Sequence, residues 1–265
     1  MNRINKMFTK LLEEKRKGVF PFIVGGYPDI KTTGDLIRVL SESGADLLEI
    51  GVPFSDPVAD GPVIQEASHE ALLRGVNIED LFTVVEHARK KTGIPIVFMS
   101  YYNPILSFGL EKTAKRAKEA GVDGFIVPDL PPEDGEKFEK ILKKNGINCI
   151  YLLTINSSKQ RIKLISKRSS GFIYLVSRLG VTGMSEIEPE PIKDTVKEIK
   201  KYSNIPIAVG FGVSTPAQAK DVSNIADAVI IGSAIVKTIR SAKKANILSE
   251  TSKFVAKIAG SVHSK

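Results

Sequence analysis

Two carboxylates are the residues in this sequence best suited to chemistry. Glu49 lies inside the apolar run DLLEIGVPF, and Asp60 lies in the segment that follows it, GVPFSDPVADGP. A carboxylate surrounded by leucine and isoleucine loses its hydration, which raises its pKa and suits it to both giving and taking a proton. The alternative is a Glu49 paired with a buried base, but the apolar runs of the chain contain no Lys or Arg. We therefore interpret Glu49 as an acid–base residue.

Asp60 has two interpretations that its position alone does not separate. It precedes Gly61 and Pro62 at an expected helix start, where an aspartate commonly forms a turn or caps a helix. It could equally be a second catalytic carboxylate. The length of this loop and its apolar residues Pro53, Phe54 and Val58 predict a lid that excludes water.

Other polar and glycine residues follow the apolar runs in the second half of the chain. Asp129 and Tyr174 are expected at strands, and Arg178 and Thr182 in the loop SRLGVTGMSE. Glycine-rich turns follow the last two runs, in GFGVST and IGSAIV. Backbone N–H groups there, at the start of a helix, predict a phosphate site formed by Gly212, Gly232 and Ser233 and closed by Gly183.

The residue types that are missing from the apolar runs limit the mechanism. The three histidines are His69, His87 and His263, on expected helices or in the tail, so no strand-end cluster is predicted to hold a metal. The runs contain no lysine, which disfavours a Schiff base, and Cys149 is expected in the core. The remaining mechanism is proton transfer by carboxylates, without a metal or cofactor in this chain.

These residues must be positioned by an alternating pattern of strands and helices. Eight near-continuous apolar runs of strand length predict parallel strands buried on both faces, at 20–28, 46–54, 94–102, 122–130, 147–154, 171–177, 205–212 and 226–233. Amphipathic segments such as TTGDLIRVLSES separate them. Because eight β-then-α units fit a closed barrel, and because no dinucleotide fingerprint follows the first run, the predicted fold is a (β/α)8 TIM barrel.

The bulk composition fits one enzyme domain covering residues 1–265. An extra N-terminal helix is expected across the barrel floor, and a closing helix near 247–259. The net charge of +8 is spread along helix-like segments without a basic arm, which favours a solvated surface over nucleic-acid or membrane binding. One cysteine, no secretory signal and no long apolar stretch predict a cytoplasmic protein.

The motifs together closely resemble the tryptophan synthase α subunit family. The resemblance covers essentially the whole chain, in the order FIVGGYPD, LLEIGVPFSDPVADGPVIQEA, MSYYNP, VPDLPPED, YLVSRLGVTG, VGFGVS and IIGSAIV. It implies a lyase that carries out retro-aldol cleavage of indole-3-glycerol phosphate to indole and D-glyceraldehyde 3-phosphate, in the last step of L-tryptophan biosynthesis.

The resemblance also implies a role for each site residue. Glu49 matches the acid–base residue, and Asp60 the carboxylate that stabilises the positive charge on the indole nitrogen. Thr182 matches the residue that bonds the aspartate on loop closure, near Arg178. The implied substrate pocket comprises Phe22, Met99, Ile126, Tyr174, Thr182 and Phe211, and the implied phosphate cradle Gly183, Gly212, Gly232 and Ser233. Two positions depart from some relatives: Phe172, where these have Tyr, and the variable Leu179.

A partner is implied as well. Family members bind a pyridoxal-phosphate-dependent β subunit, usually in an α2β2 assembly, and pass indole to it. The residues implied at that interface are Pro53, Phe54, Asp56, Asn103, Pro104, Pro131 and Pro132.

The sequence leaves two rival functions beside this one. Another phosphate-binding barrel enzyme is possible, such as an isomerase or the synthase one step upstream, but the latter is expected to carry strand-end lysines. The second rival is a catalytically silent subunit that only activates a partner, which the presence of both Glu49 and Asp60 disfavours.

Overall fold

Nine parallel strands form the centre of the molecule. The structure is a computed structural model that describes residues 2–177, 189–210 and 212–264. The strands within these residues are β1 (Gly18–Val24), β2 (Leu48–Gly51), β3 (Ile96–Met99), β4 (Gly124–Ile126), β5 (Asn148–Ile150), β6 (Leu152–Thr154), β7 (Ile173–Val176), β8 (Ile207–Gly210) and β9 (Ala228–Ile231). Their order in the sheet is β5-β4-β3-β2-β1-β9-β8-β7-β6.

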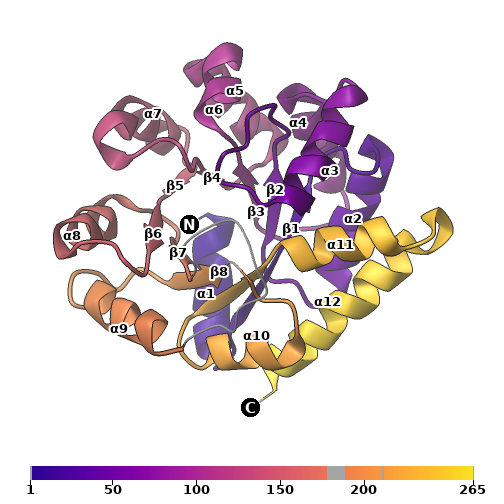
Figure 1. The fold of residues 1–265 in the computed structure, drawn as a ribbon. Coiled ribbons are helices and arrows are strands. Elements are labelled where there is room, and N and C mark those ends of the chain that lie inside the picture. Colours follow the sequence, from indigo (N-terminus) through magenta and orange to yellow (C-terminus); the bar gives the residue numbers. More distant parts are fainter. Residues whose placement is uncertain (1, 178–188, 211, 265) are drawn as a thin grey trace.

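The two ends of this sheet are neighbouring pieces of one stretch of chain. β5 pairs with β4, β6 pairs with β7, and only Tyr151 separates the two pieces. The segment 148–154 therefore brings the two edges together, and the ring in Figure 1 is nearly closed. Counted as runs of sequence, these are the eight expected strands, so the predicted (β/α)8 barrel is confirmed. The run expected at 147–154 differs only in being divided.

Helices cover this ring, the first at one end and the others on the outside. They are α1 (Arg3–Glu13), α2 (Ile30–Glu42), α3 (Pro62–Leu73), α4 (Ile78–Ala88), α5 (Tyr102–Phe108), α6 (Leu110–Ala120), α7 (Pro132–Lys144), α8 (Lys159–Arg168), α9 (Pro189–Lys200), α10 (Pro216–Ser223), α11 (Ser233–Ser241) and α12 (Ile247–His263), with a short 3-10 helix η1 (Lys244–Asn246). Two helices rather than one follow both β2 and β3. The closing helix is four residues longer than the expected 247–259. No described helix is long and apolar enough to cross a bilayer.

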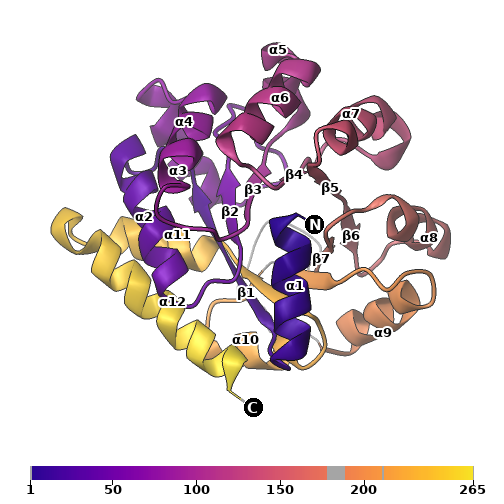
Figure 2. The same ribbon diagram turned by 180° about the vertical axis from the view of Figure 1, so that it is seen from behind.

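The N-terminal helix covers the floor of the barrel, as the sequence predicts (Figure 2). Phe8 of α1 packs against Phe20 and Phe172, which come from the N-terminal ends of β1 and β7. Phe172 therefore belongs to an aromatic cluster in the floor. Since this cluster is apolar, a phenylalanine suits the position without a hydroxyl group.

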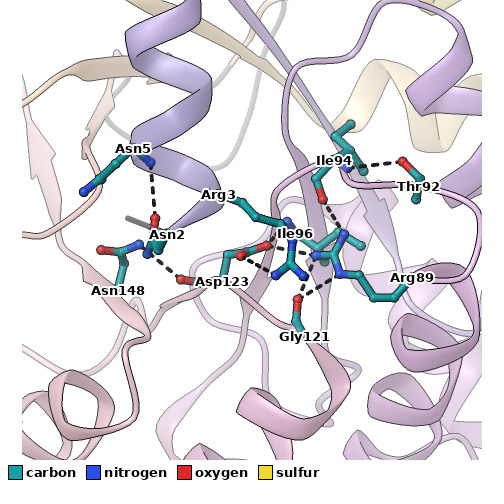
Figure 3. Close-up of polar contacts among 10 residues, drawn as sticks. All are labelled: Asn2, Arg3, Asn5, Arg89, Thr92, Ile94, Ile96, Gly121, Asp123 and Asn148. Atoms are coloured by element: carbon teal, nitrogen blue, oxygen red, sulfur yellow. Dashed lines mark hydrogen bonds and ion pairs between the residues drawn. The ribbon is translucent and has the colours of Figure 1, made fainter.

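A charged network ties the floor to the barrel (Figure 3). Asp123, just before β4, accepts hydrogen bonds from Arg3 of α1 at 3.1 Å, from Arg89 at 2.8 Å and from the amide of Ile96 at 2.9 Å. Arg89 also donates to the carbonyl of Gly121. Each buried charge therefore has polar partners, which is the condition for tolerating it in the core.

Candidate active site

Glu49 lies in the interior of the barrel. It is the second residue of β2, two residues before the end of that strand, and its Cα is in register with Phe22 of β1 and Val97 of β3. The residue is 1% exposed, and within the described part of the chain its Oε1 has no hydrogen-bond partner. Burial raises its pKa to about 8, and the negative charge of Asp60 adds to this effect.

Asp60 is buried at the entrance to α3. It lies directly before Gly61, the N-cap residue of that helix. Its Oδ2 accepts a hydrogen bond from the hydroxyl of Tyr101 at 3.2 Å, and its main-chain carbonyl accepts one from Gln65. No side chain caps α3, so the expectation that Asp60 caps this helix was wrong, whereas its amide does donate to the carbonyl of Pro57 in the turn before the helix. Burial raises the pKa of Asp60 to about 6, although the bond from Tyr101 opposes the rise.

The two carboxyl groups thus titrate on opposite sides of neutral pH. With a pKa of about 8 the side chain of Glu49 carries its proton at pH 7, and with a pKa of about 6 that of Asp60 is ionised. Neighbouring carboxyl groups whose pKa values are pushed apart can act as an acid and a fixed negative charge in one site. The pair can donate a proton at one point and stabilise a positive charge at another.

Tyr174 contributes a hydroxyl group to the same interior. It lies on β7, is buried, and contacts β8 so closely that a Cβ added at Gly210 would come within 2.6 Å of its hydroxyl oxygen. Burial raises its pKa well above the usual value, and the charges of Glu49 and Asp60 raise it further. The tyrosine is therefore a neutral hydrogen-bonding group.

Apolar side chains from three strands line the interior beside the carboxylates. Gly51 of β2 is in register with Met99 of β3, and Met99 with Ile126 of β4. A Cβ added at Gly51 would lie only 2.7 Å from the ring of Phe22. A glycine at position 51 thus leaves room for that ring. Phe22, Met99 and Ile126 are all buried, and a flat aromatic substrate suits such a lining.

The predicted phosphate residues lie after β8 and β9. Gly232 is the N-cap residue of α11 and Ser233 its first residue, and no side chain caps this helix. Gly212 follows β8 with a φ of 94°, a left-handed conformation that favours glycine. The N–H groups at a helix start without a side-chain cap can bind an anion. Gly183, Arg178, Thr182 and Phe211 lie outside the described residues.

The residues implied at the partner interface differ in exposure. Asp56, Asn103 and Pro131 are exposed, Phe54 and Pro104 are half-buried, and Pro53 and Pro132 are buried. Two large apolar side chains are exposed at these positions: Val58 of the expected lid at 78%, and Leu106 of α5, which sequence reasoning missed, at 52%. These positions follow β2, β3 and β4, at the end of the barrel where the carboxylates lie.

The remaining candidates lie on other elements of the barrel. His69 is in α3, His87 in α4 and His263 at the end of α12, and Cys149 is buried in β5. Asp129 lies three residues beyond the end of β4 and accepts a hydrogen bond from the amide of Tyr102. Among the described residues no three His, Cys, Asp or Glu side chains gather into a possible metal site.

Sequence reasoning also missed Tyr101. Tyr101 follows β3. Its position in MSYYNP, at the end of a predicted strand, could have identified it, because barrel enzymes carry their functional side chains at the C-terminal ends of the strands.

Comparison with known proteins agrees with this geometry. A family model described as tryptophan synthase alpha chain matches residues 8–263. The tryptophan synthase alpha chain of Thermoanaerobacter sp. strain X514 is 44% identical over 259 residues, which is 97% of this chain and 98% of the relative. That of Geotalea daltonii is 46% identical over 237 residues, 89% of this chain and 90% of the relative. A crystal structure of tryptophan synthase subunit alpha from Legionella pneumophila superposes with a TM-score of 0.91 at 35% identity, covering 99% of this chain and 98% of that one.

Family membership follows from matches of this extent along both chains. The barrel, its buried carboxylates and the glycines after β8 and β9 all lie within the matched residues. The chain therefore belongs to the tryptophan synthase alpha chain family, the enzymes that cleave indole-3-glycerol phosphate in tryptophan biosynthesis.

Proposed function

We propose that Glu49 and Asp60 carry out this cleavage as a pair. The observation that carries the proposal is the separation of their pKa values inside one buried site, to about 8 and about 6. A protonated Glu49 can deliver a proton, whereas an ionised Asp60 can stabilise a cation. The retro-aldol reaction requires both actions.

The steps balance with these two groups alone. The carboxylic acid of Glu49 gives its proton to C3 of the indole ring, and the resulting positive charge on the ring nitrogen is stabilised by the carboxylate of Asp60. The Glu49 carboxylate then takes the proton from the hydroxyl on the carbon attached to C3. The C–C bond breaks, its electron pair returns to the ring as neutral indole, and the aldehyde of glyceraldehyde 3-phosphate forms. Glu49 ends protonated, as it began.

The other implied residues bind the substrate in this proposal. Phe22, Met99, Ile126 and Phe211 surround the indole, with Tyr174 beside the carboxylates. Gly183, Gly212, Gly232 and Ser233 hold the phosphate, and Arg178 and Thr182 act in closure of their loop. The buried apolar side chains and the start of α11 without a side-chain cap support these assignments. The whole chain, 1–265, would then work as one barrel domain without a cofactor of its own, in the cytoplasm.

The partner in this proposal is a tryptophan synthase β subunit, in an α2β2 assembly with pyridoxal phosphate in the β subunit. Docking would use the loops with Pro53, Phe54, Asp56, Asn103, Pro104, Pro131 and Pro132. The exposed side chains of Val58 and Leu106 at the same end of the barrel support this surface, since exposed apolar residues there can be buried by a partner.

The test is release of indole from indole-3-glycerol phosphate by the purified chain, with and without a purified tryptophan synthase β subunit. We expect slow release by the chain alone and faster release with the β subunit, and no dependence on added metal or chelator. No release even with the β subunit would overturn the proposed catalysis and leave a silent activating subunit.

A further inference from the structure

Tyr101 makes a contact that the reaction as described above does not use. It follows β3, is 5% exposed, and its ring lies against that of Phe54 with a centroid distance of 5.2 Å. The hydroxyl accepts a hydrogen bond from the amide of Ala59 at 2.8 Å and donates one to Oδ2 of Asp60 at 3.2 Å. A single side chain from the loop after β3 thus contacts the loop after β2 at three neighbouring points.

The direction of these bonds fixes what the hydroxyl does. Because the Ala59 amide can only donate, it occupies a lone pair of the Tyr101 oxygen and leaves the phenol proton for Asp60. Burial and the charge of Asp60 raise the pKa of Tyr101, so the phenol stays protonated and remains a donor. Within the described residues no other side chain hydrogen-bonds the Asp60 carboxylate, so Tyr101 is the group among them that orients it.

A third loop holds Tyr101 in place. Tyr101 is the N-cap residue of α5, and its own side chain does not cap the helix because it points to Asp60. The carboxylate of Asp129, from the loop after β4, instead accepts a hydrogen bond from the first amide of that helix, Tyr102 N, at 2.8 Å. Asp129 therefore replaces the missing cap and anchors the backbone next to Tyr101.

We propose that Tyr101 is a positioning residue that aims the Asp60 carboxylate at the substrate cation, and that Asp129 holds Tyr101 for this task across the loops after β2, β3 and β4. This inference rests on the catalytic role proposed above for Asp60. Tyr101 acts through Asp60 and takes no proton itself. A loosely held carboxylate still binds substrate but stabilises the developing charge poorly, so the loss falls on kcat rather than on KM.

The test replaces Tyr101 by Phe, which removes the hydroxyl and keeps the ring against Phe54. We expect Tyr101→Phe to lower kcat for indole release about tenfold with little change in KM, in line with the loss of one hydrogen bond to a charged group. The acid limb of the pH profile should also move to higher pH, because the bond from Tyr101 lowers the pKa of Asp60.

A matched control is Tyr151→Phe. Tyr151 is 4% exposed and its hydroxyl donates to Glu139 at 3.1 Å, so this variant also breaks a buried tyrosine–carboxylate bond, but on the outer side of the barrel against α7. We expect a similar loss of thermal stability in both variants and a change in kcat and pH profile only for Tyr101→Phe. Equal kinetics in the two variants would overturn the positioning role and leave Tyr101 as a structural residue.

Variants of Asp129 test whether this residue holds Tyr101 in place. A double variant with Asp60→Asn separates failure of the positioning role from failure of the proposed function. Asp129→Ala should lower kcat in the same direction as Tyr101→Phe, whereas Asp129→Asn, which keeps an oxygen acceptor, should recover most of the loss. In an Asp60→Asn background Tyr101→Phe should have little further effect. If Asp60→Asn is itself fully active, the proposed function fails; if Asp60→Asn is impaired and Tyr101→Phe slows it by a further tenfold, only the positioning role fails.

Discussion

Phe22 and Glu49 are register partners across the parallel pair of β1 and β2, and both lie in the buried interior of the barrel. The Phe22 ring lies over Gly51, on the side of β2 that Glu49 shares, and a Cβ added at Gly232 would lie within ordinary contact distance of it. Glu49 is 1% exposed, and its neighbour across the strand pair is a buried aromatic residue. This explains why burial is the largest cause of its raised pKa.

Glu49→Gln should abolish cleavage. The amide keeps the shape of the side chain but can neither deliver a proton to C3 nor take one from the hydroxyl, so we expect kcat to fall by about three orders of magnitude or more. Indole release measures this. Glu42→Gln, on the exposed end of α2, is the matched control and should behave as the wild type. Substantial activity in Glu49→Gln would exclude the assigned acid–base role.

The pH dependence of kcat/KM should be bell-shaped. The rate should rise as pH increases through about 6, where Asp60 ionises, and fall as pH increases through about 8, where Glu49 loses its proton. Because the two groups interact, these limits belong to the pair. Steady-state rates between pH 5 and 9 measure the profile. A rate that stays constant from pH 7 to pH 9.5 would contradict a protonated Glu49 in the reactive state.

The sequence alone predicted the parts of this protein that depend on periodicity. Eight apolar runs predicted the barrel, since strands buried on both faces need continuous apolar residues, and the amphipathic N-terminal stretch predicted the floor helix. The burial of Glu49 also followed, because its neighbours in the run are apolar. The division of the 148–154 run was not predicted: its first part pairs with β4 and its second part with β7.

Contacts between loops could not be predicted from the sequence. Asp60 had two interpretations because its partner, Tyr101, lies 41 residues away and the pairing depends on how two loops pack. Asp129 looked like a candidate for chemistry because of its position after a strand. The structure instead shows it bonded to the backbone amide of Tyr102, a role that no periodic pattern encodes.

Glu49 should reduce stability as pH increases. Its pKa is raised from the ordinary value of 4.5 to about 8 on folding, so the folded protein holds this proton more tightly. The stabilisation is fully present below pH 4.5 and is lost as pH rises to about 8. At pH 8 the difference is on the order of several kcal/mol. Glu49→Gln has no such titration, so its free energy of unfolding relative to wild type should increase between pH 5 and pH 8. Urea unfolding at both values tests this, and an unchanged difference would contradict the raised pKa.

The turn after β8 should need a glycine for binding. Gly212 has a φ of 94°, so Gly212→Ala should strain the turn and misplace its N–H groups, and we expect KM for indole-3-glycerol phosphate to rise by about tenfold or more with a smaller change in kcat. Gly75→Ala is the matched control. Its φ is 77°, an added Cβ there meets nothing within 4 Å, and it lies at the far end of α3. An equal rise of KM in both variants would argue against a phosphate role for Gly212.

In the charged network of the barrel floor, loss of the buried Asp123 should destabilise the protein far more than loss of the partly exposed Arg3 (Figure 3). Burial lowers the pKa of Arg89 to about 10, and Asp123 opposes this fall, so removing the aspartate leaves a buried cation without its carboxylate. Asp123→Ala should therefore lower the free energy of unfolding by about 3–5 kcal/mol. The side chain of Arg3 is 44% exposed, and Arg3→Ala should cost no more than about 1 kcal/mol. Urea unfolding of both variants measures the difference. Equal losses would mean that α1 is held mainly by its ion pair, whereas the expected inequality would leave the packing of Phe8 against Phe20 and Phe172 as the main attachment of the helix.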